Sequence, residues 1–341
     1  MARSDRRTVL EAAGAAGIAL VSGCSGVLGG DGDDGGSEDR APDFRRWFPT
    51  AAAMGSAGGP YLYAVFDVAT LTALDGGGEG TRTETERETA TAAAAGDPLV
   101  ANPVDVYAVA TLLTEDYPEM GLSPVLDGLS AESGAVDRWV LVDGHSVFEG
   151  SFDEDELRGA VESAGYDDPT DVGEFSLYGH PDEPYAVAVH DDAVVAVSAD
   201  DGDPTAVAAA IARAGDGDDP RQHEADDTFD AVTRGTMGGD VVYGVVPGTE
   251  TFEPDSWESS NYEFDLSPFV GAVGVSQSLT VNVDSGSGTA RAHVVYGSED
   301  DVDVDRLEGL LGTAAAEFDL RQNGAEVTLE ATYGSDDVGA W

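Results

Sequence analysis

The chain has 341 residues, enough for about two domains, and its 67 acidic and 16 basic residues give a formal net charge of −51. Every basic residue is arginine, so chemistry that needs a lysine, such as Schiff-base formation, is excluded. A nucleic-acid partner is not expected, because the sequence has no basic patch to neutralise phosphates. A hydrophobic content of 41% argues against a disordered acidic chain. Because concentrated salt shortens the screening length to about 3 Å, the composition indicates a folded protein of a salty environment.

The first 24 residues have the layout of an export signal. Arg6 and Arg7 form the adjacent arginine pair that the twin-arginine pathway recognises, and Val9 and Leu10 follow it. Residues 12–20 are apolar or small, which is too short a run to cross a bilayer, since a crossing takes about 20 apolar residues. We therefore predict a signal peptide over residues 1–24.

The signal ends in the four residues Val21, Ser22, Gly23 and Cys24, an aliphatic residue and two small ones before a cysteine. This order resembles a lipobox, in which the thiol is joined to a membrane lipid and the chain is cut before the cysteine. Cys24 is the only cysteine of the chain, so no internal disulfide can form. We predict lipid attachment at Cys24, since a lipid with two chains gives a stable anchor.

Two stretches of low complexity follow. Residues 25–45 are rich in glycine and aspartate and predict a flexible acidic tether. Residues 75–98 are rich in threonine, glutamate and alanine and predict a mobile loop. The remaining sequence predicts a first domain over 60–215 and a second domain over 226–335.

Signal, lipobox, tether and composition together resemble the twin-arginine-exported lipoproteins of halophilic archaea. The resemblance implies a cell-surface location, on the outer face of the cytoplasmic membrane, with membrane lipid as a partner through Cys24. It does not imply a cofactor, because those archaea send many ordinary proteins by this route.

The sequence of the first domain predicts a mixture of strands and helices. Residues 139–142 and 146–150 predict a hairpin around Asp143 and Gly144, and an amphipathic helix follows, capped by Ser151 or Asp153. Three strands come next, and His190, Asp191 and Asp192 join the last two, which are rich in valine and alanine. Asp203 and Pro204 then begin a helix that we expect Gly215 to end.

The second domain predicts similar elements. A helix near residue 229 precedes strands near residues 243, 276 and 292. Leu307, Leu310 and Leu311 are expected to face inward from a further helix. Asn323 and Gly324 predict the turn of the last hairpin. The fold class is therefore α+β, with antiparallel sheets covered by helices in two units, and whether these arose by duplication is left open.

Motifs for chemistry are scarce. The five histidines are not spaced for zinc on a helix, and neither a nucleophile elbow nor a phosphate-binding glycine loop occurs. The acidic runs at residues 31–34 and 216–219 could hold a hard cation, but solvated loops explain them better in so acidic a chain. We therefore expect no catalytic, cofactor-binding or metal-binding residue, and no cofactor.

The aromatic residues near 44–48 and 257–269 are the last candidates for a functional surface. Either they pack into the ends of the domains, which we favour, or they form a surface for a ligand or partner. For Arg45, Arg46, Trp47 and Phe48, contact with lipid headgroups is a third alternative.

These observations favour a non-enzymatic binding or structural module with a surface protein or a small solute as partner. Two alternatives stay open. One is the solute-binding component of a transporter, which would need two parallel-stranded lobes around a cleft. The other is a secreted hydrolase, which would need a pocket with converging carboxylates or histidines.

Overall fold

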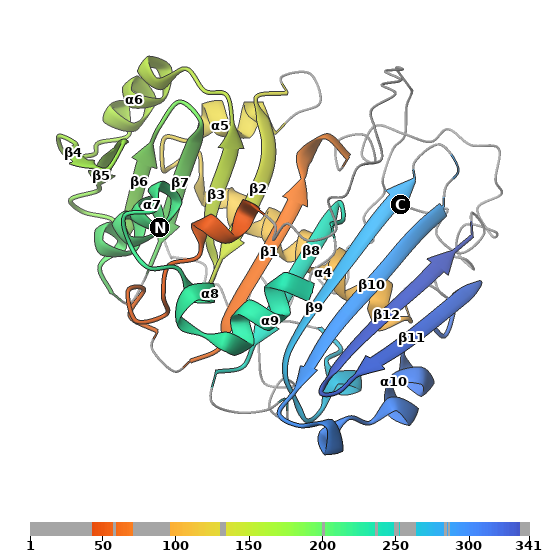
Figure 1. Cartoon of the computed structure of the whole chain (residues 1–341). Coiled ribbons are helices and arrows are strands. Elements are labelled where there is room, and N and C mark those ends of the chain that lie inside the picture. The colour runs from red at the N-terminus through yellow and green to blue at the C-terminus, as the bar shows by residue number, and fades with distance from the viewer. Residues whose placement is uncertain are drawn as a thin grey trace, which may run out of the picture.

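The computed structural model describes residues 43–56, 59–70, 96–129, 134–199, 202–235, 238–248, 252, 264–282, 285 and 287–334. These residues form one continuous sheet of 12 strands with helices on both faces (Figure 1). The predicted α+β class is thereby confirmed. The strands that the sequence assigns to two units lie in this single sheet, because β1 (Tyr61–Asp67) pairs with β2 (Val136–Val142) on one side and β8 (Val241–Val246) on the other.

The spatial order of the strands is β11-β12-β10-β9-β8-β1-β2-β3-β7-β6-β5-β4, and every neighbouring pair is antiparallel. The remaining strands are β3 (His145–Gly150), β4 (Thr170–Val172), β5 (Phe175–Gly179), β6 (Tyr185–Val189), β7 (Ala193–Ser198), β9 (Ala272–Asn282), β10 (Ser287–Tyr296), β11 (Glu317–Asn323) and β12 (Glu326–Tyr333). We call β1 to β7 the N-terminal half of the sheet and β8 to β12 the C-terminal half.

Helices cover the two faces unequally. The front face, toward the viewer in Figure 1, carries η1 (Asp43–Trp47), α7 (Pro204–Asp216), α8 (Gln222–Ala225) and α9 (Asp227–Gly235). The back face carries α4 (Pro98–Leu113), α5 (Ser123–Gly128), α6 (Glu154–Ser163) and α10 (Val304–Leu310). The short 3-10 turns are η2 (Thr114–Asp116), η3 (Ser267–Phe269) and η4 (Glu299–Asp301).

Two apolar clusters, one on each face, hold these layers together. The back cluster runs across most of the sheet, from Tyr178 in β5 to Leu329 in β12. The front cluster gathers around η1, α7 and α9 and reaches only as far as Val295 in β10. Beyond α9, the described residues place no helix over the front of β12 and β11 (Figure 1). Within the described part of the chain, the front of β11 and β12 is therefore open.

The first predicted hairpin is confirmed. Val142 pairs with His145, and the two residues between them both have positive φ, 50° for Asp143 and 86° for Gly144. Two left-handed residues in a two-residue loop make a type I′ turn, whose twist matches that of the flanking strands.

The last hairpin turns one residue later than predicted. Asn323 pairs with Glu326, so the loop residues are Gly324 and Ala325. Gly324 has φ of 61°, and Ala325 does not have positive φ. Glycine in the first loop position is the pattern of a type II′ turn, which leaves Asn323 in the strand.

Two predicted helix details need correction. The helix expected to end at Gly215 runs to Asp216, and Gly217 ends it with φ of 83°. Leu307 and Leu311 are buried as predicted, but Leu310 is 42% exposed. Because α10 has only seven residues, a single apolar stripe faces the sheet, and Leu310 lies outside it.

Candidate functional site

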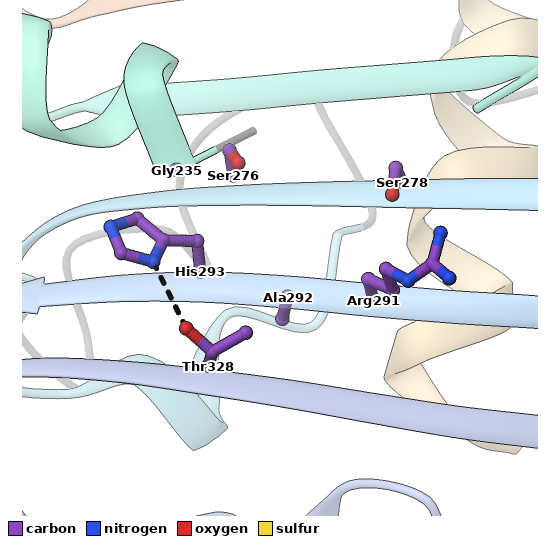
Figure 2. A pocket seen from close by; sticks show the side chains of 7 residues that line it. All are labelled: Gly235, Ser276, Ser278, Arg291, Ala292, His293 and Thr328. Atoms are coloured by element: carbon purple, nitrogen blue, oxygen red, sulfur yellow. Dashed lines mark hydrogen bonds between the residues drawn. The ribbon is translucent and has the colours of Figure 1, made fainter. Parts of the chain in front are cut away.

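A polar depression lies on the front face where α9 ends beside the open part of the sheet. Figure 2 shows its lining: Gly235 at the end of α9, Ser276 and Ser278 on β9, Arg291, Ala292 and His293 on β10, and Thr328 on β12. Alternation along each strand brings the lining side chains of β9, β10 and β12 to the front, except that of Ala292, because alternate positions such as Ala292, Val294 and Leu329 belong to the back cluster.

His293 is the buried group of this depression, with only 6% of its surface exposed. Its Nδ1 faces the hydroxyl of Thr328 at 3.5 Å, and Nε2 lies 3.6 Å from a carboxylate oxygen of Glu326. A Cβ at Gly235 would lie 2.2 Å from a ring carbon of His293, so the glycine lets the ring pack directly beneath the last turn of α9. His293 is thus a buried histidine within a strand of the sheet.

Burial lowers the pKa of His293, Glu326 acts against this shift, and Arg234 adds to it. The ring is therefore neutral at pH 7. Arg291 next to it is engaged with Glu330 at 2.6 Å, and the depression has no room for a water molecule. The arrangement is therefore a packed contact between the end of α9 and the sheet, and polar side chains line the bottom of the depression.

A second polar cluster lies in the turn between β6 and β7. Three residues of this turn each offer one atom that could bind a metal ion: His190, Asp191 and Asp192. These three atoms lie within 4.8 Å of one another. The Nδ1 atom of His190 accepts a hydrogen bond from the backbone N–H of Asp192 at 3.2 Å, which explains its orientation as part of the turn. The acidic run singled out in the sequence lies elsewhere, and its Asp216 accepts from the backbone N–H of Glu174 at 2.9 Å.

The chain enters the described fold through η1, which lies on the front face next to α7 and α9. Arg45, only 5% exposed, forms an ion pair with Asp230 of α9, and Arg234 pairs with the same carboxylate. Burial raises the pKa of Asp230, but the hydrogen bonds and charges of the two arginines outweigh burial and lower it overall. Asp230 is therefore ionised at neutral pH and holds η1 to α9.

The other side of η1 is held by Glu149 of β3. Its carboxylate accepts from the indole N–H of Trp47 at 2.8 Å and from Arg138 at 2.8 Å, and it also pairs with Arg46. The Arg46 guanidinium lies 4.7 Å above the Trp47 ring. Trp47 and Phe48 are buried at 2% and 0% exposure, so these two aromatic residues pack in the core and do not face a headgroup layer.

The sequence-predicted site residues themselves, namely Arg6, Arg7, Val21, Ser22, Gly23 and Cys24, lie outside the described residues. The acidic run at 31–34 and the tether before residue 43 also lie outside them. Within the described ranges, no helix is both long enough and apolar enough to span a bilayer.

Sequence reasoning missed Asp97, which it placed in a mobile loop. Asp97 is fully buried, caps α4 and accepts from the backbone N–H of Gly312 at 3.1 Å and of Ala314 at 3.3 Å. The hydroxyl of Tyr333 donates to the same carboxylate at 3.0 Å. The Asp-Pro pair at residues 97–98 was the available signal, because it is typical of a helix start.

No protein-family model and no curated protein matches the chain. Among solved structures, the chain is similar to the one titled "Structure of crystal form I of TP0453", at 10% identity and a TM-score of 0.41. That match covers 83% of this chain and 93% of the other. At this TM-score the likeness carries no argument about function.

Proposed function

We propose that the chain is an exported lipoprotein, held on the outer face of the cytoplasmic membrane by lipid on Cys24. There it serves as a non-enzymatic binding or structural module. The observation that carries the proposal is the order of Arg6-Arg7, an apolar core and Val21-Ser22-Gly23-Cys24 at the start of the chain.

The way the chain enters the fold supports the proposal. Roughly 20 residues separate Cys24 from Asp43, and a flexible chain of that length has an average span of about 25 Å. The described fold begins at Asp43, within the last residues of the predicted tether, and there Arg45 and Trp47 fasten η1 to α9 and β3. A pull on the tether is therefore borne by the middle of the sheet.

The antiparallel sheet bears on the solute-binding alternative. Two lobes of parallel strands would be expected of that class, whereas every described strand pair is antiparallel. This difference favours the binding or structural module.

Replacement of the anchoring thiol tests the proposal. In a halophilic archaeal host, we expect the Cys24→Ser variant to leave the membrane fraction and appear in the medium, because no other cysteine can take the lipid. The matched control is Ser22→Ala, which keeps a small residue before the cysteine and should stay in the membrane fraction. A native product that retains Met1 and an unmodified thiol by mass spectrometry would overturn the proposal.

The non-enzymatic part has its own test. The purified full-length chain should hydrolyse ester, peptide and glycoside substrates no faster than buffer at molar salt. Hydrolysis above that level, lost on replacement of His293 or of His190, would establish an enzyme instead.

Dilution of salt tests the predicted environment. Transfer from molar to tens of millimolar salt should unfold the protein, because the net charge of −51 is then no longer screened. Far-ultraviolet circular dichroism measures the loss, and an unchanged spectrum would count against a halophilic protein.

A further inference from the structure

The outer edge of β11 is suited to pairing with another strand. β11 is the last strand at the C-terminal end of the sheet and has seven residues, and among the strands that the structure describes it pairs with β12 alone (Figure 1). An unpaired edge of this length presents a row of backbone N–H and C=O groups that another chain can bind.

The hairpin determines which residues point outward. Asn323 and Glu326 close a two-residue loop, so they exchange backbone hydrogen bonds, and alternate residues of β11 do the same with β12. The N–H and C=O groups of Phe318, Leu320 and Gln322 therefore point away from β12. An antiparallel partner must pair with these three residues.

If the partner is a second copy of β11, one register pairs the outward-pointing backbone groups of all three residues. With a two-fold axis at Leu320, Leu320 pairs with its equivalent, and Phe318 pairs with Gln322 in both directions. Asp319 then lies opposite Arg321 of the other copy, twice, in the closer non-hydrogen-bonded pairs. The register is thus self-complementary in charge as well as in hydrogen bonding.

The neighbouring registers are not self-complementary in charge. A two-fold axis at Asp319 or at Arg321 would place two aspartates or two arginines opposite each other, which is unfavourable. In the single chain Asp319 and Arg321 pair with each other at 2.8 Å while 57% and 81% of their side chains stay exposed, so both are available to a partner.

Apolar surface beside this edge adds to the fit. Phe318 and Leu320 are only partly buried against the back cluster, and Leu310 of the adjoining α10 is 42% exposed. The opposite edge of the sheet differs, because β4 has three residues, and Asp171 with the preceding Asp167 and Asp168 makes it purely acidic. That edge repels a second copy.

We propose that two copies of the chain pair through β11, antiparallel about Leu320, to form one sheet across both subunits. The two-fold axis of such a pair is perpendicular to the sheet, so the front faces of both copies point the same way. Asp43 lies on η1 on that face in each copy (Figure 1). If the proposed function holds, both tethers leave toward one membrane, which raises the effective concentration of the partners.

Cysteine cross-linking tests the register. Directly opposed residues in a hydrogen-bonded pair have Cα atoms about 5.5 Å apart, within the range of a disulfide. Oxidation of the full-length Leu320→Cys variant in membranes should give a covalent dimer, whereas the control Thr170→Cys at the β4 edge should not. A monomer from both variants, equal cross-linking of both, or a cross-link to a different protein would overturn the proposal.

A charge exchange provides the second test and does not depend on a new thiol. Arg321→Asp should weaken dimerisation about tenfold or more, because both attractive cross-strand pairs become repulsive. The double variant Asp319→Arg with Arg321→Asp recreates both pairs in reverse and should restore the dimer. Failure of the double variant to recover dimers, or an unaffected single variant, would overturn it.

The dimer and the anchor can be separated. Sedimentation of the Cys24→Ser variant at molar salt should still detect dimers as its concentration rises. Dimers in that variant with no change of membrane association would overturn the anchor alone, whereas monomers at every concentration would overturn the edge pairing alone.

Discussion

The two halves of the sheet are built from the same antiparallel ladder but differ in how many faces they bury. In the N-terminal half, α7 covers the front of β6 and β7, and every residue of β6 is buried. In the C-terminal half α9 covers the front of β8, β9 and part of β10, but at β11 and β12 the described residues cover only the back. There β12 alternates buried with half-buried or exposed residues along its length. The comparison shows that the composition of each strand follows the number of faces it buries.

The same comparison explains the placement of polar groups. Where both faces are covered, buried charges such as Glu149 are paired with arginines and with Trp47. Where one face is open, the front positions hold hydroxyls and surface ion pairs, such as Arg291 with Glu330. Removal of a group should therefore cost more in the N-terminal half than at the open front of the C-terminal half.

The largest effect is expected from Trp47→Ala, which removes the aromatic residue that packs η1 onto the covered half. The Trp47 ring lies edge-on to Phe175 and fills the space above Gly215, where a Cβ would lie 2.2 Å from it. We expect the free energy of unfolding to fall by about 3–5 kcal/mol in chemical denaturation at molar salt. Arg46→Ala, whose side chain is 43% exposed, is the control and should cost less than about 1 kcal/mol. Equal costs would show that η1 is not part of the core.

Two Asp-Pro helix starts provide the next test. Asp97 caps α4 from a fully buried position and also binds Gly312, Ala314 and Tyr333, whereas Asp203 caps α7 from the surface. Asp97→Ala leaves buried donors without a partner and should cost about 3 kcal/mol or more. Asp203→Ala should cost about 1 kcal/mol, the ordinary worth of a cap. Thermal unfolding of both variants measures the difference, and similar values would show that Asp97 is only a cap.

A reciprocal exchange of similar side chains compares the front face of the two halves directly. Val195→Thr in β7 buries a hydroxyl in the front cluster and should cost about 1–3 kcal/mol. Thr328→Val in β12 loses only the 3.5 Å contact with His293 at the open front and should stay within about 0.5 kcal/mol of the parent. A large loss from Thr328→Val would mean that the open face is covered in the folded protein.

The sequence predicted local elements well because their signals are local. Asp143 and Gly144 predict a two-residue hairpin turn, and Asp203 with Pro204 predicts the start of α7. Leu310 was misplaced because helical spacing alone does not say how short a helix is. The turn at Gly324 was one residue off because Asn-Gly and Gly-Ala are both acceptable loops.

The joining of the strands into one sheet could not be predicted in this way. β1 pairs with β8 across a wide gap in sequence, and the pairing needs Gly244, where a Cβ would lie 2.3 Å from the Tyr63 ring. The Arg45–Asp230 pair and the burial of His293 beneath Gly235 likewise join distant segments. Periodicity carries no information about such partners, so the polar sites became visible only in the fold.

The smallest effect concerns two histidines, one in each half. Burial lowers the pKa of His145 in the covered half to about 4, while for His293 Glu326 opposes the lowering by burial. A histidine whose folded pKa lies below its unfolded value of about 6.5 takes up protons on unfolding, so its contribution to stability is complete above pH 6.5 and is lost as the pH falls toward 4. Between pH 7 and pH 4.5 the free energy of unfolding should therefore fall by about 1–2 kcal/mol less in the His145→Asn variant than in the parent. For His293→Asn the difference from the parent should be smaller. Urea unfolding at both pH values and constant molar salt measures this, and an identical acid loss in parent and His145→Asn would show that His145 is already protonated in the folded protein.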